Sequence, residues 1–125
     1  PDLLSLLRDV VQREHERVSE LLEAAGVSIT GSYVCFHHPQ SLVDGFGACR
    51  CRKPNPYFLH QAAREHEIDL SRSWMAGDQD SDIETGKRAG CRTALIEYEH
   101  SLAKRGATTP DLLCASLAEL IRRLD

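Results

Sequence analysis

The run Ser73-Trp74-Met75-Ala76-Gly77-Asp78-Gln79-Asp80-Ser81-Asp82 indicates the fold class of this chain. Residues 73–77 form a short apolar run, which predicts a strand that enters a turn. A helix is expected over about residues 80–89, because Gly90 follows as a stop signal. Residues 92–98 then return to a strand pattern. A strand, a helix and a second strand in succession favour an α/β fold with a parallel sheet.

Other elements are expected on both sides of this unit. Apolar residues at steps of three and four predict an amphipathic helix over about residues 2–25. A short strand is expected over residues 32–36, which are aromatic and β-branched. The pair Asn55-Pro56 is typical of a helix start, and this helix should run to about residue 67. A capping box over residues 116–119 opens the final helix.

The size and charge of the chain limit its class. Its 125 residues are enough for one domain with a modest core, so residues 1–125 are interpreted as a single domain. The net charge of −4 argues against a general nucleic-acid binder. We expect no membrane span and no signal peptide, because no apolar run is long enough to cross a bilayer. Five cysteines, an odd number, fit reduced thiols in a cytoplasmic protein better than a disulfide scaffold.

Two pairs of potential metal ligands lie close together in the sequence. Cys35 and His37 are two residues apart, as are Cys49 and Cys51. Side chains two apart on an extended chain point the same way, which favours His37 over its neighbour His38. Three thiolates and an imidazole form a closed ligand set of the structural zinc type. We therefore predict a zinc loop over residues 35–51, and the alternative is a chance group of reduced cysteines.

The acidic turn after the strand is a second candidate site. Asp78 is the first residue beyond the strand, at the sheet edge where α/β folds place their chemistry, and its oxygens suit Mg²⁺. An EF-hand loop is excluded, because its glycine and glutamate positions hold Ile83 and Ala89. For Asp80 the alternative role is to cap the following helix. The turn is therefore interpreted as a magnesium site that centres on Asp78.

The motifs C-x-H-H-P, C-x-C-R-K-P-x-P and G-D-x-x-x-D, taken together, resemble the haloacid dehalogenase superfamily. Within it, the chain resembles the zinc-containing branch of heptose bisphosphate phosphatases and histidinol-phosphate phosphatases. The resemblance covers nearly the whole chain and implies a Rossmann-like parallel sheet. It also implies phosphomonoester hydrolysis, in which an aspartate attacks the phosphoryl group and Mg²⁺ neutralises charge. D-glycero-D-manno-heptose 1,7-bisphosphate is the favoured substrate, and histidinol phosphate is the alternative.

The same resemblance implies roles for single residues. Lys53 matches the lysine that stabilises the phosphoryl oxygens, and Arg52 is similar to the arginine that recognises the substrate. Asp78 matches the Mg²⁺ ligand, with Gln79 next to the metal. Asp82 would lie behind these groups and orient Lys53. The zinc ligands of the branch match the two Cys/His pairs described above.

One departure from the family pattern is serious. The D-x-D-x-T loop that carries the nucleophile is absent from the sequence. The most similar string is Asp78-Gln79-Asp80-Ser81-Asp82, in which Asp82 occupies the position of the threonine. The Ser/Thr loop after the second strand is absent as well. We therefore expect a carboxy-terminal portion of a phosphatase, with a sheet incomplete on its amino-terminal side and no activity by itself. Three explanations remain open: a truncated or proteolysed product, a split enzyme whose partner chain supplies the first strands, and a degenerate pseudoenzyme. The last would be a non-catalytic zinc-stapled module that binds phosphosugars.

Overall fold

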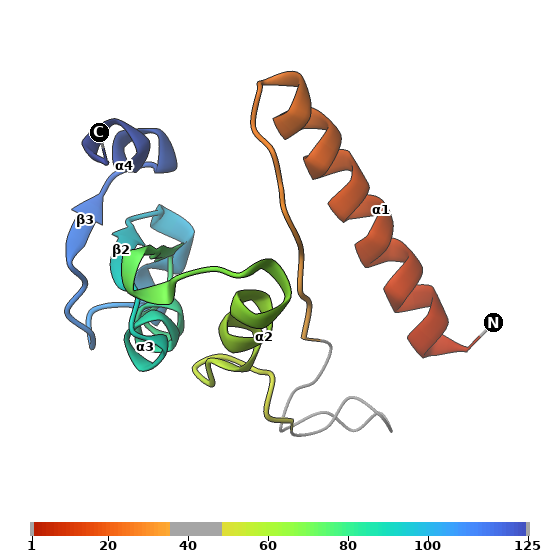
Figure 1. The fold of residues 1–125 in the computed structure, drawn as a ribbon, viewed down its shortest axis with the longest axis horizontal. Helices are drawn as coiled ribbons and strands as arrows, with labels where there is room; N and C mark the ends of the chain where they lie inside the picture. The colour runs from red at the N-terminus through yellow and green to blue at the C-terminus, as the bar shows by residue number, and fades with distance from the viewer. Residues whose placement is uncertain (1, 36–48, 125) are drawn as a thin grey trace. The chain divides into compact units, whose positions relative to one another are not determined.

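The computed structural model describes residues 2–35 and 49–124 (Figure 1). The chain forms two compact units, Pro1–Gly47 and Ala48–Asp125, and each is described by itself. The expectation of a single domain over residues 1–125 therefore stays a prediction. In the described part of the chain, no helix is both long and apolar enough to cross a membrane.

The first unit contains the helix α1, Leu3–Ala24, which confirms the predicted amphipathic helix. The side chain of Asp2 caps its start and accepts a hydrogen bond from the backbone N–H of Ser5 at 2.8 Å. The helix ends where Gly26 adopts a left-handed conformation with φ of 84°, which glycine tolerates without steric cost.

The strand expected over residues 32–36 is wrong for the described part of that segment. Residues 32–35 belong to no strand, and Phe36 lies outside the described residues. A β-strand is stabilised by hydrogen bonds to a neighbouring strand. Over residues 2–35 the regular structure consists of a helix, which offers no such neighbour. A β-branched and aromatic composition alone does not create a sheet.

The second unit is built on a parallel sheet in the order β1, β2, β3 (Figure 1). The strands are β1, Trp74–Gly77; β2, Arg92–Ile96; and β3, Leu112–Cys114. The register pairs Trp74 with Arg92 and Ala94 with Leu112. Between β1 and β2 the chain forms α3, Asp80–Ala89, which ends at Gly90 with φ of 83°. The predicted α/β class and parallel sheet are confirmed, whereas β3 was not predicted.

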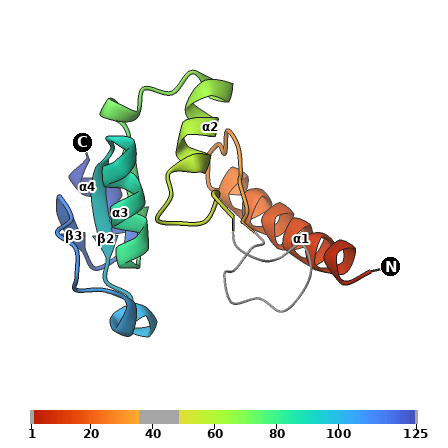
Figure 2. The ribbon, with the colours of Figure 1, turned by 90° about the horizontal axis from the view of Figure 1, so that it is seen from below.

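Helices cover both faces of β2 (Figure 2), and the buried core residues lie between these helices and the sheet. Side chains alternate between the faces of a strand, so Ala94 and Ile96 share one face and Thr93 lies on the other. Ala94 and Ile96 cluster with Leu120 of the helix α4, Leu117–Arg123. Gly86 of α3 packs so closely on the opposite face that a Cβ there would lie 2.8 Å from the Thr93 methyl group. The sheet is therefore covered by α3 on one side and by α4 on the other.

The remaining elements complete the second unit. The predicted helix after Asn55 is α2, Tyr57–His66, and the Asn55 side chain accepts a hydrogen bond from the Tyr57 N–H at 3.1 Å. The predicted capping box opens α4, because the Glu119 N–H donates to Ser116 Oγ at 3.1 Å. Two short 3₁₀ helices were not predicted, namely η1, Leu70–Arg72, and η2, Glu99–Lys104.

Candidate functional site

The turn between β1 and α3 is locked by reciprocal hydrogen bonds. The Gln79 N–H donates to Oδ2 of Asp82 at 3.1 Å, and the Gln79 backbone carbonyl accepts from the Asp82 N–H at 3.0 Å in return. This capping box satisfies backbone donors at the start of α3 that have no partner within the helix. The turn is therefore held in one conformation at the carboxyl end of β1, where Asp78 leaves the strand.

Lys53 reaches this turn from the segment before α2. Its Nζ forms a close ion pair with Oδ1 of Asp82, so the two oxygens of that carboxylate serve two different partners. The side chain of Asp82 is only 7% exposed, whereas that of Lys53 is 47% exposed. A buried carboxylate needs such partners, because burial of an unpaired charge is costly. The structure thus places Asp82 where it can orient the ammonium group of Lys53 beside the turn.

Gly77 is a site residue that the sequence reasoning missed. A Cβ at this position would collide with the carboxyl group of Asp82, so the approach between strand and helix requires glycine. The signal was present in the G-D-x-x-x-D motif, in which the glycine and the last aspartate are five residues apart. Gly77 and Asp82 are therefore complementary parts of one packed junction.

Asp78 lies next to His100, a residue to which the sequence analysis assigned no role. Oδ2 of Asp78 lies 3.3 Å from Nε2 of His100, and the exposed fractions of the two side chains are 26% and 77%. The His100 ring stacks on Tyr98 with centroids 5.5 Å apart and planes 14° from parallel. These residues meet because β1 and β2 are parallel neighbours, so the segments that follow both strands leave the same sheet edge.

The oxygen atoms of the Asp78 carboxylate are suitable ligands for a magnesium ion. A hard cation such as Mg²⁺ prefers oxygen ligands, and the Asp78 carboxylate offers Oδ1, which receives no hydrogen bond from the described residues. Gln79 is the N-cap residue of α3, and its backbone N–H and carbonyl both bond to Asp82. Asp78 is therefore the direct candidate for the cation, and a place for Gln79 next to the metal stays a prediction.

The cysteine pair of the second unit has the chemistry of a zinc site. The sulfur atoms of Cys49 and Cys51 lie 3.0 Å apart, and none of the five cysteines forms a disulfide. Thiolates are ligands that zinc prefers, and Cys35, the third predicted cysteine ligand, belongs to the first unit. The fourth predicted ligand, His37, lies outside the described residues. The zinc site therefore stays a prediction.

Arg52 immediately precedes Lys53 and is exposed. Its backbone carbonyl accepts a hydrogen bond from the Asn55 N–H at 2.9 Å, which closes a turn before α2. This turn carries Lys53 toward Asp82. The predicted role of Arg52 in substrate recognition rests on the sequence alone.

Asp80 ties α3 to the loop before β3, rather than capping the helix. Its carboxylate accepts hydrogen bonds from the backbone N–H groups of Gly106 at 3.1 Å and Ala107 at 3.0 Å, and from Thr108 Oγ1 at 2.7 Å. These bonds favour the charged form, and the Ala107 N–H is the main cause of a lowered pKa for Asp80, followed by the Thr108 hydroxyl. The N-cap of α3 is Gln79 instead.

Known proteins resemble this chain. Residues 50–120 match the HAD-hydrolase-like family, in which HAD stands for haloacid dehalogenase. A relative from Helicobacter pylori (strain J99), the D-glycero-beta-D-manno-heptose-1,7-bisphosphate 7-phosphatase, is 35% identical over 117 residues, which cover 92% of this chain and 61% of the relative. The protein of the same name from Yersinia pestis is 37% identical over 97 residues, which cover 76% and 52%. The chain thus spans between half and two thirds of the length of these relatives.

A solved structure shares the fold. The D,D-heptose 1,7-bisphosphate phosphatase from B. bronchiseptica, crystallised with magnesium and phosphate, matches with a TM-score of 0.74 and 27% sequence identity. The match covers 91% of this chain and 62% of that protein. The similarity therefore extends over most of the present chain, while more than a third of the neighbour has no counterpart in it.

Proposed function

This chain belongs to the haloacid-dehalogenase-like hydrolases, and on that premise we propose that it is the carboxy-terminal part of a magnesium-dependent phosphatase. The proposed substrate is D-glycero-D-manno-heptose 1,7-bisphosphate. Support comes from the names of the relatives in Helicobacter pylori and Yersinia pestis, and from the magnesium and phosphate in the structural neighbour. A cytoplasmic location completes the proposal and fits cysteines that form no disulfide.

The observation that carries the proposal is the junction of Lys53, Asp82 and Asp78 at the carboxyl end of β1. An ammonium group has three N–H donors, and Asp82 engages one of them. Within residues 2–35 and 49–124 no other acceptor engages Lys53, so its two further donors could stabilise the negative charge of phosphoryl oxygens during transfer. A magnesium ion held by Asp78 would neutralise charge on the same phosphoryl group. Lys53 would thus supply one positive charge, and Asp78 a ligand for a second cation, beside the turn after β1.

The sequence holds no D-x-D-x-T motif, so these 125 residues lack the nucleophile of the family mechanism. We propose that an upstream segment supplies it, either on the same polypeptide or on a partner chain. In the family mechanism one aspartate of that motif attacks the phosphorus atom, and a second aspartate acts as the general acid and base. Lys53 and Asp78 would then hold the phosphate and neutralise its charge.

A structural zinc ion held by Cys35, His37, Cys49 and Cys51 is the second part of the proposal. The ligand set ends directly before Arg52 and Lys53, so a bound ion would fix the segment that delivers Lys53 to Asp82. Elemental analysis of the purified protein should find one zinc per chain. A Cys49→Ser variant with undiminished zinc content would remove this part of the proposal.

The phosphatase activity is tested with the protein expressed from its complete coding sequence. With Mg²⁺ present, we expect phosphate release from D-glycero-D-manno-heptose 1,7-bisphosphate and little from histidinol phosphate. Residues 1–125 alone should release none, because they lack the nucleophile. Release of phosphate from neither substrate by the complete protein would refute the proposal, whereas a preference for histidinol phosphate would reassign the substrate.

A further inference from the structure

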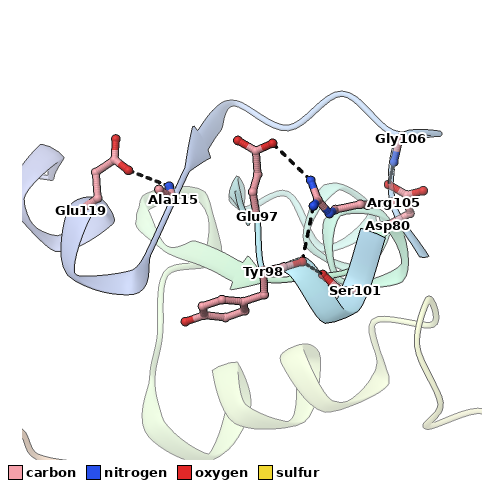
Figure 3. A network of polar contacts seen from close by, with 8 residues as sticks. All are labelled: Asp80, Glu97, Tyr98, Ser101, Arg105, Gly106, Ala115 and Glu119. Carbon is pink, nitrogen blue, oxygen red and sulfur yellow. Dashed lines mark hydrogen bonds and ion pairs between the residues drawn. The ribbon is translucent and has the colours of Figure 1, made fainter. Parts of the chain in front are cut away.

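The loop between β2 and β3 is fastened at its base by Arg105. Nη1 of Arg105 forms an ion pair with Oε2 of Glu97 at 3.2 Å, and Nη2 of Arg105 donates a hydrogen bond to the carbonyl of Tyr98 at 3.4 Å (Figure 3). The Arg105 side chain is only 14% exposed. Both partners lie at the end of β2, so the arginine folds the later part of the loop back onto the point where the loop begins.

A second set of bonds fixes the turn that leads into η2. Ser101 is buried, and its hydroxyl donates to the Tyr98 carbonyl at 2.9 Å while its backbone N–H donates to the same atom at 3.2 Å. Beyond η2, the Asp80 carboxylate holds residues 106–108 against the start of α3. The loop is therefore bonded at one end to the residues that follow β2 and at the other to α3, the helix that begins at the site turn.

This fastened loop presents His100 to one oxygen of Asp78. The imidazole is exposed, yet its position is defined by the stack on Tyr98 and by the contact of Nε2 with Oδ2. Among the described residues, the Asp78 carboxylate has a polar side-chain contact with His100 and with no other residue. The pair formed by Lys53 and Asp82 does not share this contact, so His100 acts on the site from a separate element.

We propose that His100 is a positioning residue that orients the Asp78 carboxylate for a divalent cation. By engaging Oδ2 it would leave Oδ1 for the cation and reduce the rotational freedom that the carboxylate would otherwise lose on binding. Groups that contact a metal-ligating side chain typically change metal affinity by about 10- to 100-fold. The inference rests on the proposed function, because that proposal makes Asp78 the magnesium ligand.

The opposite role for His100 predicts an effect of opposite sign. If the imidazole competed with the cation for the carboxylate, its removal would free Asp78 and tighten magnesium binding. If the imidazole orients the carboxylate, its removal weakens binding. The direction of the change in Mg²⁺ affinity therefore separates a positioning residue from a competitor.

The test is a titration of residues 1–125 with MgCl₂, in which NMR measures the chemical shift of the Gln79 backbone amide and gives the Mg²⁺ affinity. We expect His100→Ala to weaken Mg²⁺ binding by about tenfold, at the lower end of the range for such partners. His100→Gln, which keeps an N–H donor, should restore most of the affinity. His66→Ala removes an exposed imidazole at the end of α2 and is the matched control, with affinity unchanged.

Each other outcome overturns the inference. Affinity that is unchanged or higher in His100→Ala, or a failure of His100→Gln to restore it while both variants keep the melting temperature of the parent, would exclude a positioning role. An absence of Mg²⁺ binding in the parent chain would exclude both this role and Asp78 as a ligand. Phosphate release by the complete protein is measured separately, so failure of the inference is distinguishable from failure of the proposed activity.

Discussion

Gly77 and the carboxyl group of Asp82 occupy adjoining space that leaves no room for a side chain at position 77. The carboxyl group cannot easily move away, because Gln79 N–H and Lys53 Nζ hold its two oxygens. This close packing joins the end of β1 to the first turn of α3. Glycine at this position therefore allows the close approach at which Asp82 engages both Gln79 and Lys53.

Gly77→Ala should lower the free energy of unfolding by about 1–3 kcal/mol, the usual cost of an extra methyl group in a packed site. Urea denaturation of residues 1–125 measures this change. The matched comparison is the same substitution in an Asp82→Ala background, where the obstructing carboxyl group is gone and the cost of the methyl group should shrink. Equal costs in both backgrounds would contradict the collision between position 77 and Asp82.

The ion pair of Lys53 with Asp82 gives a second prediction. Lys53→Met should lower the free energy of unfolding by about 1–2 kcal/mol, less than for a fully buried pair because Lys53 is about half exposed. In the complete protein the same substitution should lower kcat by on the order of 100-fold or more, since it removes a donor to the phosphoryl oxygens.

A surface ion pair serves as control for the stability measurement. Arg88 and Glu84 lie one helical turn apart on α3 with both side chains about half exposed, so Arg88→Met should cost at most about 1 kcal/mol. Equal losses of unfolding free energy for Lys53→Met and Arg88→Met would show that the burial of Asp82 does not strengthen its ion pair with Lys53. A normal kcat for Lys53→Met would remove Lys53 from the proposed mechanism.

The helices and the first two strands could be predicted because their signals are local. Gly90 after α3 and the Ser116 cap of α4 act within one helical turn, where sequence patterns are strongest. The strand β3 has three residues and owes its place to a contact 18 positions away, in which the Thr93 N–H donates to Asp111 at 2.7 Å. The sequence of β3 itself contains no pattern that predicts this contact between distant residues.

The candidate site shows the same limit. Asp78 was predicted from its place after a strand, and Lys53 and Asp82 from the family pattern. His100 was not predicted, because its contact with Asp78 depends on which strands are neighbours in the sheet. Asp80 carried a local signal for helix capping, yet its partners at 106–108 lie 26 to 28 positions away. Contacts between distant segments need the tertiary fold.

Asp69 provides a prediction about pH. The Ser71 hydroxyl donates to the Asp69 carboxylate at 2.6 Å, and this bond is the main cause of a lowered pKa for Asp69. Because the folded-state pKa lies below the unfolded value, the stabilisation is fully present above that value, about 3.9, and is lost as the pH falls through the folded-state pKa. NMR titration should show that Ser71→Ala raises the Asp69 pKa, and Ser5→Ala, which leaves Asp69 untouched, should not. An Asp69 pKa that is the same with and without the Ser71 hydroxyl would contradict this assignment.

Cys91 should be slow to alkylate in the folded protein. Burial raises the pKa of its thiol, so less of the reactive thiolate is present at any given pH. In a time course with iodoacetamide at pH 8, read by mass spectrometry of the peptides, Cys91 should react much more slowly in the folded chain than in urea. The buried Cys114 should behave alike because reagent cannot reach it, which gives an internal comparison. Rapid labelling of Cys91 under native conditions would mean that the turn after α3 opens readily, and that the junction between α3 and β2 is less firmly packed than the structure shows.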